Sequence, residues 1–113
     1  MIQIYHNPRC SKSREALDLL RNKNVDFEEI HYLKVGLSLE ELKNILQKLD
    51  MKPMHLVRSK EKIWQEEFAG KNLSEDEIIN AMILYPQLME RPVVIHNQKA
   101  VIARPAEKMD EIL

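Results

Sequence analysis

The first 32 residues switch twice between the hydrophobic pattern of a strand and that of a helix. Residues 2–6 form an apolar, β-rich run that stops at Asn7-Pro8, and residues 11–20 then carry apolar side chains at helical spacing. The segment Val25–Tyr32 returns to a strand pattern. A strand, a helix and a strand in this order predict a βαβ unit with parallel strands and a right-handed crossover, which places the chain in the α/β class.

The middle of the chain is expected to be helical, because two capping-box signatures each precede apolar residues at helical spacing. The two boxes are Ser38 with Glu41 and Ser74 with Glu77. Between them, residues 53–71 predict shorter helical pieces.

The end of the chain returns to a strand pattern. Residues 92–95 and residues 100–102 are short apolar runs on either side of a predicted turn at Asn97-Gln98, and residues 106–113 predict a final short helix. The expected order is therefore βαβ, several helices, ββα.

Length and charge narrow the class of protein. At 113 residues the chain is expected to form a single domain, residues 1–113. A formal net charge of -1 argues against a nucleic-acid partner. Because there is neither an apolar run of about 18 residues nor a secretory signal pattern, we expect a cytoplasmic protein with no membrane partner.

The chain has one cysteine, Cys10, between the first predicted strand and the first predicted helix. Unpaired backbone N–H groups and the positive end of the dipole at a helix N-terminus stabilise a thiolate, and Arg9, Lys12 and Arg14 add positive charge. An inert, buried cysteine is the alternative, but these polar neighbours are poorly suited to an apolar pocket. The same helix terminus binds phosphate-like oxyanions, so a nucleophile and an oxyanion site are expected to coincide.

Other side chains near Cys10 and the distribution of arginine fit this expectation. Ser11 and Ser13 are placed to cap the helix, and His6 is a candidate for tuning the thiol. Arg91 and Arg104 each precede a proline at a strand boundary, and the planar arginine fork suits an oxyanion better than lysine does. No metal site is expected, because one cysteine and scattered histidines provide no recognised ligand spacing.

Four segments of the chain together resemble the glutaredoxin-dependent arsenate reductase family. They are residues 5–14 (YHNPRCSKSR), 56–58 (LVR), 91–94 (RPVV) and 104–107 (RPAE), in the family's order. The resemblance spans essentially the whole chain. It implies a thioredoxin-like fold with a central mixed four-stranded sheet and a helical insertion between the second and third strands.

The resemblance also implies a set of functional residues. They are Cys10 as the nucleophile, Arg58, Arg91 and Arg104 as oxyanion ligands, His6 for thiol activation, Ser11, Ser13 and Arg14 at the helix N-terminus, and Pro92 as the active-site proline. The implied reaction reduces arsenate, or a similar small oxyanion, to arsenite through a covalent arsenic–cysteine adduct. Glutathione would act as co-substrate and glutaredoxin as a partner, with no tightly bound cofactor and a monomeric protein.

Three alternatives stay open at this point. Two are other activities, and the third is that the chain is a family member that has kept the fold and lost its activity. Cys10 and Ser13 form a Cys-x-x-Ser arrangement, like that of monothiol enzymes which act on glutathione mixed disulfides. The chain also resembles the Spx-type transcriptional regulators of the same fold superfamily, which bind RNA polymerase. These regulators commonly carry Cys-x-x-Cys, and Ser13 departs from that pattern.

Overall fold

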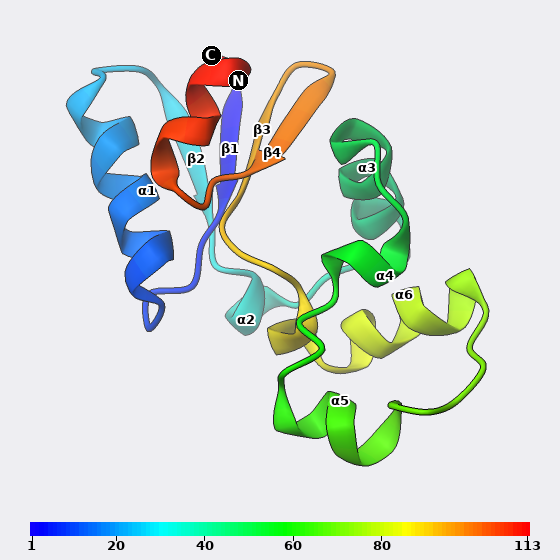
Figure 1. Ribbon diagram of the computed structural model, residues 1–113. Coiled ribbons are helices and arrows are strands. Elements are labelled where there is room, and N and C mark those ends of the chain that lie inside the picture. Colours follow the sequence, from blue (N-terminus) through cyan, green and yellow to red (C-terminus); the bar gives the residue numbers. More distant parts are fainter. The chain divides into compact units, whose positions relative to one another are not determined.

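The computed structural model describes all 113 residues and divides into two compact units (Figure 1). Unit 1 consists of Met1–Val35 and Arg91–Leu113, and unit 2 of Gly36–Glu90. Both ends of the chain therefore belong to unit 1, and unit 2 is inserted between its two segments. The expectation of a single domain stays a prediction.

Unit 1 is built on a mixed four-stranded sheet. Its strands are β1 (Ile2–Tyr5), β2 (Phe27–Ile30), β3 (Val93–His96) and β4 (Lys99–Ile102), in the spatial order β2-β1-β3-β4. Strand β1 pairs parallel with β2 and antiparallel with β3, and β3 pairs antiparallel with β4. The predicted parallel βαβ unit and the predicted hairpin near the C-terminus are both confirmed.

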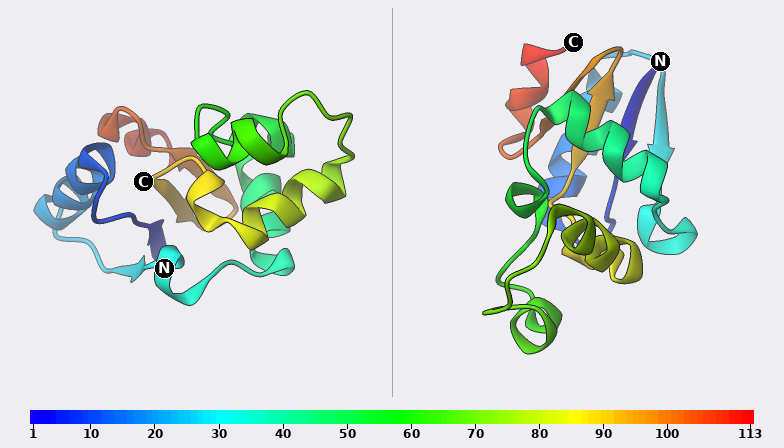
Figure 2. Two further views of the ribbon diagram at one scale, coloured as in Figure 1. Left: turned by 90° about the horizontal axis from the view of Figure 1, so that it is seen from below. Right: turned by 90° about the vertical axis from the view of Figure 1, so that its right-hand side faces the viewer.

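Helix α1 (Ser11–Asn22) and the 3-10 helix η2 (Ala106–Glu111) lie side by side on one face of this sheet, in blue and red in Figures 1 and 2. Alternate residues of a strand share a face, so Ile2 and Ile4 of β1 both contribute to the core between sheet and helices. The other buried members of this core are Ala16, Leu17, Leu20, Val94, Ala103, Ala106 and Met109.

Unit 1 differs from the sequence-based expectation in three local details. Strand β2 is shorter than predicted, because the chain turns into the one-turn helix α2 (Tyr32–Val35). The C-terminal segment is a 3-10 helix that ends at Glu111. Neither Ser11 nor Ser13 caps α1, because the N-cap position is held by Cys10, whose side chain makes no capping hydrogen bond.

Unit 2 is helical, as predicted. Its elements are α3 (Leu39–Leu49), α4 (Pro53–Leu56), α5 (Lys62–Glu67), α6 (Glu75–Leu84) and the 3-10 helix η1 (Pro86–Leu88). Ser38 and Ser74 each form the complete predicted capping box, in which the serine hydroxyl accepts from the N3 backbone N–H and the N3 glutamate accepts from the serine backbone N–H. Helix α6 packs against α3 and α4 (Figure 2).

A short antiparallel pairing joins the residues that follow α4 to the last residues of unit 2. Val57 pairs with Met89, the N–H of Arg58 donates to the carbonyl of Leu88 (2.7 Å), and the N–H of Glu90 donates to the carbonyl of Leu56 (2.8 Å). These bonds fix the backbone of Arg58. None of the helices in either unit combines the length and the apolar character that crossing a bilayer requires.

Candidate active site

Cys10 occupies the junction between the β1–α1 loop and the first turn of α1. Its backbone is extended (φ -98°, ψ 122°), and its carbonyl accepts the first helical hydrogen bond from the N–H of Arg14 (3.0 Å). The thiol is free of any disulfide and partly exposed. Cys10 therefore lies at a helix N-terminus, as predicted from the sequence, and its role as a nucleophile stays a prediction.

The loop before Cys10 is held by Asn7, which the sequence analysis treated only as part of a turn. The N–H of Cys10 donates to the carbonyl of Asn7 (3.0 Å), and the side-chain Oδ1 of Asn7 accepts from the N–H of Arg9 (3.0 Å). Nη1 of Arg14 donates to the carbonyl of Pro8 (2.8 Å). An asparagine followed by proline is a recognised signal for such a turn, but its role in positioning a thiol depends on the fold.

His6 and Ser13 form a buried pair beneath the loop. Ser13 Oγ accepts from the N–H of Asn7 (2.9 Å) and lies 2.7 Å from Nδ1 of His6. Because the hydroxyl already accepts one hydrogen bond, its own proton is available for donation to an unprotonated Nδ1. Burial lowers the pKa of His6, and nearby positive groups on His31, Arg21 and Arg14 lower it further, against an opposing effect of Glu29.

The environment of Cys10 stabilises its thiolate. Burial alone raises the pKa of the thiol, but the backbone N–H of Ser13, the guanidinium of Arg91 and the backbone N–H of Lys12 lower it, and the net effect is a pKa below the ordinary value. Arg91 acts both by a hydrogen bond to Cys10 and by its charge. The cation identified beside the thiol thus comes from the segment before β3.

Arg91 and Arg104 lie together at the entry to β3 and the exit from β4. Nη1 of Arg104 donates to the carbonyl of Arg91 (3.4 Å), and the N–H of Ala103 donates to the carbonyl of Pro92 (2.9 Å). The Arg91–Pro92 peptide bond is cis, as is the bond after Arg104. Unit 1 therefore brings Cys10, Arg91 and Pro92 into one neighbourhood, with Arg104 attached to it.

Arg58 lies in unit 2, where the pairing of Val57 with Met89 holds its backbone. Its Nε is 3.7 Å from Oε2 of Glu61, beyond hydrogen-bonding distance. Both Nε and Nη1 are buried without a hydrogen-bond partner. Leaving a donor in this state costs about 1–3 kcal/mol, so these N–H groups are suited to an acceptor oxygen of a ligand.

The remaining predicted residues have structural positions of different kinds. Ser11 is exposed on the first turn of α1, and no hydrogen bond to its side chain is present. Arg14 holds the loop through the carbonyl of Pro8, and its charge lowers the pKa of His6, whereas its expected effect on the Cys10 thiol stays a prediction. No group of three or more His, Cys, Asp or Glu side chains is arranged to hold a metal ion.

A cavity of about 510 Å³, here called the loop cavity, opens beside the β1–α1 loop. Residues 6–9 line one side of it, and His31, Leu33 and Lys34 line the other. Nε2 of His31 is 2.6 Å from Oε2 of Glu29, and the His31 ring meets the His6 ring edge to face at 5.8 Å. Sequence reasoning missed His31, because the predicted βαβ unit makes the two strands parallel but determines neither their register nor the residue at which the second strand ends.

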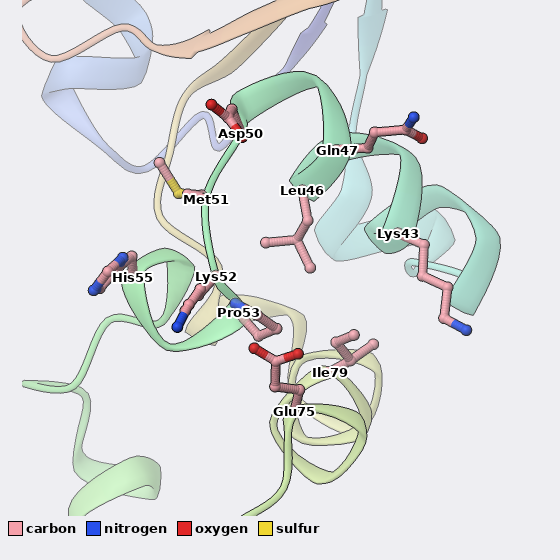
Figure 3. Close-up of a pocket in the computed structure, with 10 residues that line it drawn as sticks. All are labelled: Lys43, Leu46, Gln47, Asp50, Met51, Lys52, Pro53, His55, Glu75 and Ile79. Carbon is pink, nitrogen blue, oxygen red and sulfur yellow. The ribbon is translucent and has the colours of Figure 1, made fainter.

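Unit 2 has a cavity of about 710 Å³, here called the helix cavity (Figure 3). Leu46 of α3 points toward Pro53 and Ile79 in its middle. The formal charges of its lining cancel in pairs: Lys43 and Lys52 with Asp50 and Glu75. The helix cavity therefore has no charge preference for an anion, and it contains no nucleophile.

A mixed sheet whose first strand leads directly to a cysteine at a helix N-terminus defines a thioredoxin-like protein with one thiol at that position. The ArsC family model matches residues 5–112. Arsenate reductases from Neisseria meningitidis serogroup B and Escherichia coli K12 are 40% and 32% identical to this chain, cover 99% of it, and are themselves covered over 97% and 80% of their lengths. The chain belongs to the ArsC family.

The solved structures support the same assignment. The structure of an arsenate reductase from Vibrio cholerae superposes with a TM-score of 0.95 at 43% identity, covering 99% of this chain and 97% of that one. The predicted fold class and the predicted family are therefore both confirmed.

Proposed function

We propose that the protein reduces arsenate to arsenite through a covalent arsenic–cysteine adduct on Cys10, with glutathione and glutaredoxin supplying the electrons. The observation that carries the proposal is the position of Cys10 at the N-terminus of α1, where helix N–H groups and the guanidinium of Arg91 lower the pKa of its thiol. Such donors attract a small oxyanion to the nucleophile and offset the repulsion between two negative groups.

In the first step the sulfur of Cys10 attacks arsenic and an S–As bond forms. One arsenic oxygen leaves as water after it takes up protons, and arsenic stays in oxidation state five. Arg91 and Arg104 neutralise charge on the remaining oxygens. The family resemblance implies Arg58 as a third oxyanion ligand, and its Nε and Nη1 have no hydrogen-bond partner within the structure.

The second step is a condensation with glutathione. The S–H of glutathione adds at arsenic, a second S–As bond forms, and another oxygen leaves as water. A thiolate of glutaredoxin then attacks the glutathione sulfur. The electron pair of that S–As bond passes to arsenic, which becomes arsenic(III), while glutathione and glutaredoxin form a mixed disulfide.

Hydrolysis of the last S–As bond releases arsenite and restores the Cys10 thiol. The chain has one cysteine, so the second sulfur must come from outside.

A coupled assay with arsenate, glutathione and glutaredoxin tests this proposal. We expect arsenite from the wild-type protein and none from Cys10→Ser, and we expect mass spectrometry without glutathione to detect an arsenic adduct on Cys10. Replacing glutaredoxin with thioredoxin identifies the electron donor. Arsenite production by Cys10→Ser at the wild-type rate would overturn the mechanism.

The competing activity on glutathione mixed disulfides is distinguished by Arg58→Gln. Removing one oxyanion donor typically lowers the rate about 100-fold, whereas disulfide exchange needs no anion clamp. A protein that reduces mixed disulfides, produces no arsenite and is unaffected by Arg58→Gln would belong to that alternative. Recovery of RNA polymerase with the protein from a lysate would instead favour the regulator.

A further inference from the structure

The loop cavity combines a suitable size with a position next to the nucleophile. Its volume of about 510 Å³ is within the range of about 300–1,000 Å³ typical of small-molecule sites. Arg9 lines it and directly precedes Cys10, so their Cα atoms are about 3.8 Å apart. A molecule held in the loop cavity therefore contacts the same loop that carries Cys10, although Cys10 itself is not one of the lining residues.

The charge of the loop cavity is positive. Arg9 and Lys34 line it, both are exposed, and neither forms an ion pair within the structure. Two carboxylates, Glu28 and Glu29, line an adjoining cavity together with Lys34 and His31. Glu29 is paired with His31 at 2.6 Å and with Arg21 at 3.5 Å, and Glu28 accepts a hydrogen bond from Nε2 of Gln3 at 2.9 Å. His6, which also lines the cavity, carries no negative charge that would repel an anion. Arg9 and Lys34 are therefore both available to an anionic ligand.

The lining is also partly apolar. Pro8 and Leu33 lie in it beside the two cations, which suits a ligand with a short aliphatic or peptide portion between charged groups. The helix cavity of unit 2 lacks this selectivity, because its charged residues cancel.

We propose that the loop cavity binds the carboxylate-bearing end of the small thiol that reacts at Cys10, with Arg9 and Lys34 as its anchors. This inference rests on the proposed function and identifies where the glutathione of that reaction binds. Anchored there, the thiol S–H lies beside the arsenic adduct, where an S–As bond forms, an As–O bond breaks, and the oxygen leaves as water with the thiol proton.

The kinetic test compares Lys34→Gln with the matched control Lys43→Gln, which removes the same charge from the helix cavity. We expect Lys34→Gln to raise the KM for glutathione about fivefold with kcat unchanged, as the loss of one exposed charge pair predicts. The KM for glutathione diethyl ester, whose carboxylates carry no charge, should be higher than that for glutathione and insensitive to Lys34→Gln. Lys43→Gln should match the wild type with both thiols.

A binding measurement separates this inference from the proposed function. S-methylglutathione cannot react, and we expect it to shift the backbone amide resonances of Arg9 and Lys34 in Cys10→Ser protein. These shifts, together with a wild-type protein that produces no arsenite, would support the cavity and refute the arsenate reaction. Arsenate reduction with an unchanged glutathione KM in Lys34→Gln and no such shifts would overturn the cavity alone.

Discussion

The thiolate of Cys10 is stabilised from two separate parts of the chain. The backbone N–H groups of Lys12 and Ser13 belong to α1, which follows the cysteine directly, whereas the Arg91 guanidinium comes from the segment that enters β3. Helix N–H groups are present in any helix that begins at a cysteine. The charge of Arg91 is therefore the part of the site that the tertiary structure supplies.

Replacing Arg91 should make Cys10 less reactive near neutral pH. Because the guanidinium lowers the pKa of the thiol, Arg91→Gln is expected to raise that pKa, so that the thiolate forms only at higher pH. The midpoint of the rate of alkylation by iodoacetamide against pH should therefore move upward. Arg21→Gln, which removes the same charge from the far end of α1, is the control and should leave the midpoint in place. Equal midpoints for Arg91→Gln and wild type would refute this role.

At the candidate site, the position of the cysteine could be predicted from the sequence, but the cation beside it could not. Cys10 at a helix start followed from local pattern alone, because strand, turn and helix signals are all short-range. A stabilising charge was expected from the neighbours Arg9, Lys12 and Arg14, and the structure adds Arg91, whose guanidinium lowers the pKa of the thiol. Which cation faces a thiol is decided by side-chain direction, and the pattern of residues does not contain that direction.

At the scale of single elements, helix starts were the most predictable features. In the capping boxes at Ser38 and Ser74, each serine exchanges hydrogen bonds with a glutamate three residues later in the chain. The local sequence therefore determines these boxes without tertiary information. The backbone N–H of Ser74 lowers the pKa of Glu77. The contribution of this hydrogen bond to stability is present above the ordinary pKa of glutamate, and it is lost as the pH falls through the lowered pKa of Glu77.

Removing either capping serine should destabilise the protein by about 1 kcal/mol, because one orphan backbone N–H at the helix start loses its acceptor. Ser38→Ala and Ser74→Ala, measured by urea unfolding at pH 7, test this. Ser59→Ala is the matched control, since Ser59 is exposed and lies outside the helices. If all three variants unfold at the same urea concentration, the capping boxes contribute nothing measurable.

Strand ends were less predictable than helix starts. The apolar pattern of Val25–Tyr32 indicates one strand, yet β2 ends at Ile30 and Tyr32 begins α2. Tyr32 is fully buried, so its apolar character reflects packing within the fold and not a strand. Apolar residues at the end of a strand are compatible with a longer strand or with the start of a helix, and only tertiary packing decides between the two.

At the scale of the whole molecule, unit 1 depends on contacts between the two ends of the sequence. Strand β1 lies between β2, which follows it closely in the chain, and β3, which returns only after the 55 residues of unit 2. Ile4 of β1 and Leu20 of α1 share a core with Met109 of η2. The C-terminal residues thus support the strand that leads to Cys10.

Replacing Met109 with alanine should therefore destabilise unit 1, and the effect should extend to β1. Met109 is fully buried, and a methionine-to-alanine change in a core costs about 2–5 kcal/mol through lost burial and the cavity that remains. Met54→Ala is the matched control, because Met54 is 41% exposed and its loss should cost no more than about 0.5 kcal/mol. Urea unfolding measures both free energies of unfolding.

Hydrogen exchange then locates the effect of Met109→Ala. Because η2 and β1 share one core, the amides of Ile4 and its neighbours in β1 should exchange faster in Met109→Ala than in wild type, and not in Met54→Ala. Faster exchange confined to η2, with β1 as protected as in wild type, would show that the C-terminal 3-10 helix unfolds independently. In that case the strand before Cys10 would be stable without it.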